Sequence, residues 1–384
     1  MFYRFRMFIF LLLIVTFLVT VSFYSDDIDS SNLNNLKKDE ELKYKIGQML
    51  MVGFRGVKAT DDSYITGVIK DLELGGIVLF DYDVSTKSFL RNIVNPDQTK
   101  KLILNLQSYA KVPLLIAVDA EGENVNRLKP DYSFLNIISA KEMGKNIDAV
   151  TKESKRLAVE LKELGFNMNL APVVDVDINP NNPIIGGLNR SFSSDPNKVT
   201  TYAASFIKAH NEENIITVEK HFPGHGSSVS DSHLGMVDIT NTYQEKELIP
   251  YIELQKKGLL DVVMTAHIIN RNVDENYPAT LSSNFLQKIL RQQIGFGGII
   301  ISDDLNMNAI VDNYGFKEAV VKAVNAGCDI LLISNNGTSE YDEQLPYKVR
   351  DIIYEAVKSG YISQKTTMES YDRIYNLKKK FGII

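Results

Sequence analysis

Short apolar runs alternate with amphipathic stretches over most of the chain. The apolar runs predict eight strands, at Gly47–Gly53, Gly76–Phe80, Pro113–Val118, Phe166–Val174, Ile215–Val218, Asp261–Thr265, Gly298–Ile301 and Asp329–Ile333. A strand that is buried on both faces forms a nearly continuous apolar run, whereas a half-exposed strand alternates between apolar and polar residues. The pattern therefore predicts a parallel sheet that is covered on both faces.

The stretches between these runs have the spacing of amphipathic helices. They include residues 148–164, 197–211, 242–257, 281–293 and 317–326. Gly165, Gly258 and Gly327 each stand between a helix and the next strand, where glycine commonly ends a helix. Eight strand–helix units predict an α/β fold, a (β/α)8 TIM barrel. The long loops after the second and fourth strands are expected to carry small insertions.

Length and composition fit a single catalytic domain. A TIM barrel takes about 250 residues, and this chain has 384, of which 44% are apolar. The formal net charge of −6 argues against nucleic acid as the main partner. Cys328 is the only cysteine, which excludes an intramolecular disulfide and a cysteine-based metal site. We expect a monomer that needs neither a cofactor nor a metal.

The first residues have the pattern of a targeting segment. Arg4 and Arg6 precede an uncharged run from Met7 to Phe23, which is long for a signal-peptide core and short for a membrane span. Residues 1–25 are therefore expected to be a signal peptide or an uncleaved anchor, with membrane attachment through residues 7–23. Residues 26–42 form a polar linker, and residues 43–384 form the catalytic domain. Both alternatives place that domain outside the cytoplasmic membrane, in the periplasm or the extracellular space, because the arginines stay on the cytoplasmic side.

Polar residues follow six of the eight predicted strands. They are Asp119, Asp175 and Asp177, Lys220 and His221, His267, Asp303 and Asp304, and Asn335 and Asn336. Chance could place one or two acids at strand ends as helix caps, but it does not explain polar residues at six of eight ends. In a TIM barrel, the catalytic groups lie at the carboxyl ends of the strands. The whole set is therefore expected to meet in one cleft.

Two adjacent acids, Asp303 and Asp304, end the seventh predicted strand. Neighbouring strand residues point to opposite faces, so we expect Asp303 to face the barrel mouth as a nucleophile or base. Asp304 would then cap the following helix. The alternative is that both acids are helix caps.

Three of the five histidines lie within thirteen residues of one another. The segment Lys220-His221-Phe222-Pro223-Gly224-His225-Gly226 is followed by Asp231-Ser232-His233. In an extended segment, residues i and i+2 share a face, so Asp231 can orient the His233 ring as a general acid and base. The alternative is an exposed loop histidine beside an acid.

Two arginines accompany a carboxylate near the predicted mouth. Asp119, Arg127 and Arg190 could hold a polyhydroxylated ligand, because carboxylates accept and guanidinium groups donate hydrogen bonds. Surface salt bridges are the alternative for each arginine. His267 is either a group that supports the site or a packed core histidine.

These motifs resemble those of the β-N-acetylglucosaminidases of glycoside hydrolase family 3, and the matching pieces span residues 45–375. The Lys220–Gly226 segment with Asp231-Ser232-His233 is highly specific for this group. The resemblance implies that Asp303 is the nucleophile, that His233 is the acid/base, and that Asp231 is its partner. It also implies sugar-binding roles for Asp119, Arg127, Arg190, Lys220 and His221. Ala120 and Glu123 depart from the usual motif, which could alter what lies beyond the terminal sugar.

The resemblance implies a retaining exo-β-N-acetylhexosaminidase. Its carbohydrate substrate would be a terminal β-linked N-acetylglucosaminide, in peptidoglycan fragments or chitooligosaccharides. Because imidazole does not repel anions, a phosphorylase that uses phosphate as the acceptor is an alternative. Two other classes stay open, namely a metal-dependent hydrolase and a non-catalytic sugar-binding barrel.

Overall fold

The computed structural model describes residues 35–231, 235–337 and 340–384. The chain divides into two compact units, Met1–Tyr44 and Lys45–Ile384. Residues 35–48 are helical, so the end of the predicted polar linker is helical as well. Its lysine, glutamate and leucine residues favour a helix. The predicted targeting segment, Met7–Phe23, and the candidate acid/base, His233, lie outside the described residues. Within them, no helix is long and apolar enough to cross a membrane.

The strands of the second unit form two main parallel sheets. The larger sheet has the order β15-β1-β2-β5-β8-β9, and the smaller has the order β10-β12-β14. Their bounds are β1 Leu50–Val52, β2 Gly76–Leu79, β5 Leu115–Val118, β8 Met168–Asn169, β9 Ile216–Thr217, β10 Glu219–Phe222, β12 Val262–Thr265, β14 Ile299–Ile301 and β15 Leu331–Ile333. Every predicted apolar run contains a strand, and Ile215–Val218, which contains β9, also leads directly into β10. The prediction of parallel strands in an α/β fold is therefore confirmed.

Two isolated parallel bridges lie between these sheets. Val173 pairs with Lys220, and Ile301 pairs with Ile330. Only Val218 separates β9 from β10 along the chain. The fourth predicted strand is shorter than its apolar run, since β8 covers two residues. Pro172 lies in the remainder of that run and cannot donate a backbone hydrogen bond to a ladder.

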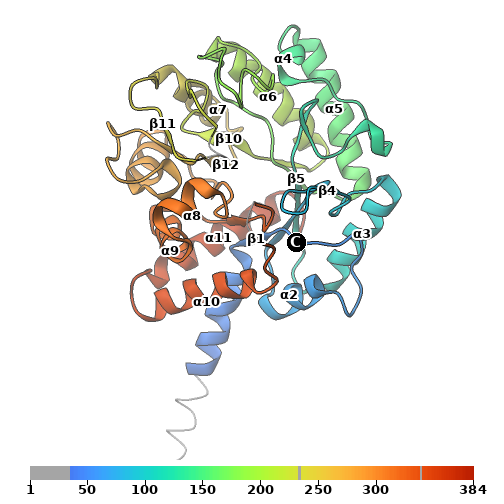
Figure 1. Cartoon of the computed structure of the whole chain (residues 1–384), viewed down its shortest axis with the longest axis vertical. Coiled ribbons are helices and arrows are strands. Elements are labelled where there is room, and N and C mark those ends of the chain that lie inside the picture. Colours follow the sequence, from blue (N-terminus) through green and yellow to red (C-terminus); the bar gives the residue numbers. More distant parts are fainter. Residues whose placement is uncertain (1–34, 232–234, 338–339) are drawn as a thin grey trace, which may run out of the picture. The chain divides into compact units, whose positions relative to one another are not determined.

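Helices surround the strands of this unit (Figure 1). They are α2 Tyr64–Leu72, α3 Pro96–Tyr109, α4 Ala140–Met143, α5 Ile147–Leu164, α6 Pro196–Glu212, α7 Ile249–Lys256, α8 Asn308–Tyr314, α9 Phe316–Ala326, α10 Leu345–Lys358 and α11 Gln364–Lys380. Three short 3₁₀ turns span Pro130–Tyr132, Glu245–Leu248 and Ala279–Leu281, and Asn284–Gln293 is π-helical. Gly165 and Gly327 end α5 and α9 with φ of 95° and 118°, as the sequence predicts.

Two hairpins extend the loops that follow β2 and β5. Strands β3 (Tyr82–Asp83) and β4 (Ser88–Phe89) pair antiparallel after β2. Strands β6 (Ala120–Gly122) and β7 (Val125–Asn126) do so after β5. A third small pair, β11 (Val237–Asp238) with β13 (Ile268–Ile269), is parallel. The hairpin after β2 is the insertion expected there. Because these segments follow the carboxyl ends of the strands, they form walls above the strand ends.

Candidate active site

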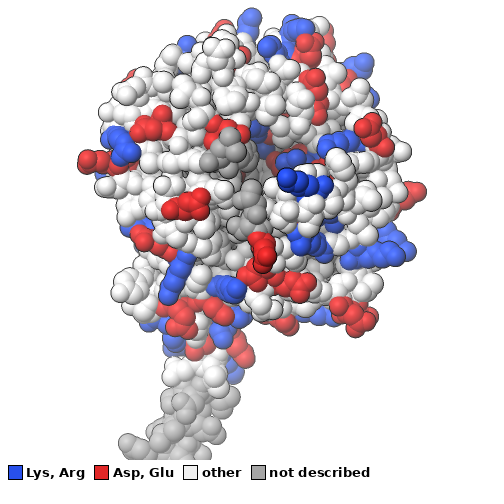
Figure 2. Space-filling model, viewed as in Figure 1, with Lys and Arg blue, Asp and Glu red and all other residues white. Residues whose placement is uncertain are grey.

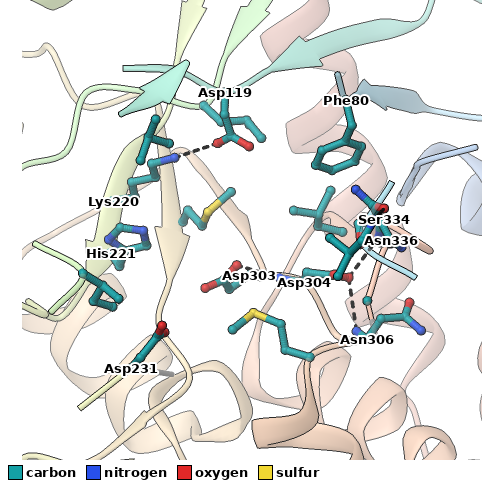
Figure 3. Close-up of a pocket in the computed structure, with 18 of the residues that line it drawn as sticks. Phe80, Asp119, Lys220, His221, Asp231, Asp303, Asp304, Asn306, Ser334 and Asn336 are labelled. Atoms are coloured by element: carbon teal, nitrogen blue, oxygen red, sulfur yellow. Dashed lines mark hydrogen bonds and ion pairs between the residues drawn. The ribbon is translucent and has the colours of Figure 1, made fainter. Parts of the chain in front are cut away.

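Side chains that follow different strands line one cavity of about 380 Å³. Of the eight site residues predicted from the sequence, the structure brings seven into its lining: Asp119, Arg127, Arg190, Lys220, His221, Asp231 and Asp303. The eighth, His233, lies outside the described residues. Figure 3 shows Asp119, Lys220 and His221 on one side of the cavity, Ser334 and Asn336 on the other, and Asp303 between them.

One wall is a cluster of buried, paired charges. Lys220 Nζ lies 2.8 Å from Asp119 Oδ1 and 2.7 Å from Glu121 Oε1. Arg190 donates two hydrogen bonds of 2.7 Å to the same glutamate, from Nε and Nη2. Burial raises the pKa of Glu121, but the charges of Arg190 and Lys220 outweigh it and hold that pKa below its usual value. The cluster is therefore ionised and fixed by bidentate geometry.

Arg127 extends this wall towards the open side of the cavity. Its Nη2 lies 3.5 Å from Asp119 Oδ2, and its side chain is 32% exposed, against 7% for Arg190. Burial raises the pKa of Asp119, but Lys220 and then Arg127 lower it to a net value well below the usual range. Asp119 therefore presents an ionised acceptor beside a partly exposed donor.

His221 is held in one orientation by groups on both sides of its ring. Its Nδ1 lies 2.7 Å from Asp175 Oδ2, and its Nε2 lies 3.2 Å from Arg190 Nη2. A guanidinium group can only donate, so Nε2 accepts and Nδ1 carries the proton. Asp175 also accepts the backbone N–H of His225 at 2.8 Å. The sequence placed Asp175 at a strand end but gave no signal for this pairing, which joins segments distant in the chain.

Asp303 and Asp304 follow β14 and have different surroundings. Asp303 accepts the N–H of Asp304 through Oδ1 at 2.8 Å, and its own N–H donates to the Thr265 hydroxyl at 3.3 Å. Its carboxyl group lies in the middle of the cavity (Figure 3). This is the position that the alternation of strand residues predicts for a reacting carboxylate.

The carboxyl group of Asp304 is hydrogen-bonded to the loop after β15. Oδ1 accepts the backbone N–H of Ser334 at 2.9 Å and that of Asn306 at 3.1 Å, and Oδ2 accepts the Ser334 hydroxyl. Burial raises the pKa of Asp304. The prediction that Asp304 caps the following helix was wrong, because α8 begins after Met307 without a side-chain cap. Asp304 instead joins the two loops that flank Asp303.

The two other described histidines near the strand ends, His225 and His267, are buried, and His225 also lines the cavity. His267 Nε2 donates to the carbonyl oxygen of Asp304 at 2.9 Å, so this histidine supports the turn that carries Asp303. Burial, followed by the neighbouring His221, lowers the pKa of His225 to about 4. Among the residues that the structure describes, no group of three or more His, Cys, Asp or Glu side chains is arranged to hold a metal ion.

The rest of the lining was only partly predicted from the sequence. Asp304 and Asn336 were expected there as residues at strand ends. Apolar side chains such as Phe80, Met264 and Met307 were not, because their spacing carries no signal. Ala120 and Glu123 do not line the cavity, since Ala120 is buried in β6 and Glu123 is exposed at the β6–β7 turn. The departure from the family motif at these two residues therefore lies outside the lining.

Comparisons with known proteins agree with this geometry. The family model described as glycosyl hydrolase family 3 N terminal domain matches residues 41–377. A β-hexosaminidase of Tolumonas auensis is 36% identical over 274 residues, which cover 70% of this chain and 78% of that protein.

Two solved structures are similar over most of the chain. The family 3 β-N-acetylglucosaminidase from Paenibacillus sp. str. FPU-7 has a TM-score of 0.80 and 33% identity, covering 89% of this chain and 62% of that one. The β-N-acetylhexosaminidase from Beutenbergia cavernae has a TM-score of 0.77 and 25% identity, covering 88% of this chain and 98% of that one. This chain thus spans less than two thirds of the Paenibacillus protein.

Proposed function

The chain belongs to glycosyl hydrolase family 3 and is a glycosidase, and we propose that it is a retaining exo-β-N-acetylhexosaminidase that releases terminal β-linked N-acetylglucosamine. The observation that carries this proposal is the place of the Asp303 carboxyl group, in the cavity opposite the ionised cluster around Lys220. The names of the similar proteins above support the choice of sugar.

The ionised wall binds the hydroxyl groups of the terminal sugar. Asp119 accepts hydrogen bonds from hydroxyl groups, and Lys220 and Arg127 donate to hydroxyl oxygens. Glu121 and Arg190 fix Lys220 from behind and are themselves buried. Because these groups are held before the substrate arrives, little reorganisation is needed when it binds. The sugar is thereby oriented with its anomeric carbon towards Asp303.

The reaction then proceeds by two displacements. The Asp303 carboxylate attacks the anomeric carbon while His233 protonates the departing oxygen, which gives a glycosyl-enzyme intermediate. His233 next removes a proton from water, which attacks the same carbon and frees Asp303. Two inversions retain the configuration. Asp231 orients the His233 ring, in keeping with its place in the cavity lining.

We also propose that the two parallel sheets are parts of one closed (β/α)8 barrel, which makes up the catalytic domain of residues 43–384. The consecutive strand order within each sheet and the bridges Val173–Lys220 and Ile301–Ile330 support this closure. A barrel explains why residues from distant segments meet at one face.

The domain is further proposed to act outside the cytoplasmic membrane. The support is the sequence of Arg4, Arg6 and the apolar run Met7–Phe23. Peptidoglycan fragments and chitooligosaccharides are the substrates proposed for that location. Fractionation that recovers the full-length protein in the cytoplasm would contradict it.

Product analysis tests the proposed activity. The protein is incubated with nitrophenyl β-N-acetylglucosaminide and with muropeptides, with and without phosphate, and the first-formed products are followed by NMR. We expect free N-acetylglucosamine that appears first as the β-anomer under both conditions. An α-anomer would contradict retention, and a sugar phosphate would identify a phosphorylase.

A further inference from the structure

The β3–β4 hairpin presents an apolar surface at the mouth of the cavity. Tyr82 and Val84 line the cavity, and Val84 is 38% exposed. Phe89 is 58% exposed, and its ring packs edge-on against Tyr82 with centroids 5.1 Å apart. We name Tyr82, Val84 and Phe89 the hairpin platform. Contiguous apolar exposure beside a binding cavity commonly marks a ligand-binding surface.

Buried charges hold the base of this hairpin in place. Asp83 Oδ2 accepts hydrogen bonds of 2.6 Å from Arg55 Nε and from Arg91 Nη1. Asp83 and Arg91 are only 3% and 4% exposed. Asp83 Oδ1 also accepts the backbone N–H of Thr86 at 3.0 Å, which closes the turn of the hairpin. The exposed apolar side chains therefore stand on a rigid base rather than on a loose loop.

The hairpin is also joined directly to the cavity wall. The side chain of Asn336, which lines the cavity, accepts the backbone N–H of Val84 at 3.0 Å and donates to the carbonyl oxygen of Tyr82 at 3.0 Å. Arg91 Nη1 donates to the same amide oxygen at 2.9 Å. The hairpin platform is thus continuous with the lining and fixed relative to it.

Figure 2 shows the mixed charge of the surrounding surface. Acidic and basic side chains are interspersed on the visible face of the molecule, around the hollow at its centre. A surface of this kind does not favour a strongly charged partner. A sugar substrate offers polar hydroxyl groups and the apolar C–H face of its pyranose ring. The apolar hairpin platform suits the C–H face.

We propose that the hairpin platform binds the second sugar of the substrate, the residue that departs when the terminal sugar is transferred to Asp303. This inference rests on the proposed hexosaminidase activity. The terminal sugar occupies the ionised wall, and the next pyranose ring stacks on Phe89 and Tyr82. The substrate class is therefore a β-linked glycan of at least two sugars, and simple glycosides with small leaving groups do not use the platform.

The test compares two substrates in matched variants. N-acetylglucosaminyl β-fluoride has a one-atom leaving group that does not reach the hairpin, whereas N,N′-diacetylchitobiose carries a second sugar. For Phe89→Ala, we expect the ratio of kcat/KM for chitobiose to that for the fluoride to fall about 3- to 10-fold, the range expected for a lost ring contact. Phe89→Tyr keeps the ring and should restore the ratio. Tyr361→Ala removes a ring that is 77% exposed elsewhere and should not change it.

Each outcome supports or overturns one of the two proposals. Phe89 is a surface residue, so its variants should have the melting temperature of the unaltered protein, which is measured alongside. An unchanged ratio in an active Phe89→Ala enzyme would overturn the platform while leaving the hexosaminidase activity intact. If the unaltered protein hydrolyses neither substrate, the proposed function itself is overturned, together with the inference that rests on it.

Discussion

The adjacent side chains of Asp303 and Asp304 show how surroundings assign roles to identical groups. Both side chains line the cavity, but the carboxyl group of Asp304 is hydrogen-bonded to Ser334 and Asn306, so it is a structural link between two loops. The carboxyl group of Asp303 lies in the middle of the cavity (Figure 3). The sequence could predict that the two acids face different ways, because strand residues alternate. It could not predict the partner of Asp304, because Ser334 belongs to the next strand–helix unit and only the folded sheet brings the two together.

Arg127 and Arg190 also have different surroundings, since Arg127 is partly exposed and Arg190 is buried. Their replacement should therefore affect different properties, namely activity for Arg127 and stability for Arg190. Arg127→Ala removes a partly exposed donor and should lower kcat/KM about 10- to 100-fold, since a charge-assisted hydrogen bond is worth about 1.5–3 kcal/mol. Its melting temperature should change little. Arg190→Ala leaves Glu121 with one buried cation instead of two, and should lower the free energy of unfolding by about 3 kcal/mol. Urea unfolding and kinetics on both variants check this contrast, and equal stability losses would contradict it.

His210 makes the fold sensitive to acid. Its Nδ1 lies 2.9 Å from the carbonyl oxygen of Phe206, and its Nε2 lies 3.2 Å from Asn169 Nδ2. A carbonyl accepts and an amide nitrogen donates, so the ring is neutral in the native state. Burial lowers its pKa from the usual 6.5 to about 4. Protons therefore favour the unfolded state, and its contribution to stability is complete above pH 6.5 and is lost as the pH falls towards 4.

The measurement is the free energy of unfolding at pH 7 and pH 4.5, for the unaltered protein and for His210→Gln. The protonation of His210 in the unfolded state contributes about 2.5 kcal/mol to the fall in stability between these two pH values, and the glutamine variant should lack that part. The glutamine variant should still lose some stability at pH 4.5, because the pKa of His225 is lowered as well. Identical pH slopes in the two proteins would show that His210 does not titrate in this way.

Individual strands and helices were predictable where a local signal exists. Strands such as β14, with three consecutive isoleucines, form continuous apolar runs, and glycines such as Gly165 mark helix ends. An insertion was expected after β2, but neither its hairpin nor the one after β5 was predicted, because the registers of the hairpins depend on contacts with other segments. Examples are the pairs of Asp83 with Arg55 and of Asn336 with Val84. The π-helical segment Asn284–Gln293 was expected only as a helix, since periodicity does not distinguish these helix types.

The turn after β10 depends on close backbone approach at Gly226. A Cβ atom added there would lie 1.7 Å from the carbonyl oxygen of Val176, so Gly226→Ala must displace the loop that leads to Asp231. We expect a loss of about 1–3 kcal/mol in stability, together with reduced activity. Gly297→Ala is the matched control, because a Cβ there meets nothing within 4 Å. If both alanine variants unfold at the same temperature, this account of the turn is wrong.

At the scale of the whole molecule, the cavity is a consequence of the strand arrangement. Asp119, Lys220, Asp303 and Asn336 are far apart in sequence but follow strands whose carboxyl ends lie at one face of the parallel sheets. The sequence could therefore predict which residues gather there. The ion pairs around the cavity, such as that of Arg190 with Glu121, were not predictable, because side-chain geometry depends on the completed fold.

Covalent labelling tests the central claim, that Asp303 is the nucleophile of a retaining glycosidase, most directly. An activated glycoside with fluorine at C2 slows release of the intermediate, so the sugar should remain attached to the enzyme. Mass spectrometry of the digested protein should find the added mass on Asp303, and Asp303→Asn should be folded, unlabelled and nearly inactive. A label on Asp304, or an enzyme that turns over normally and is never labelled, would contradict the account.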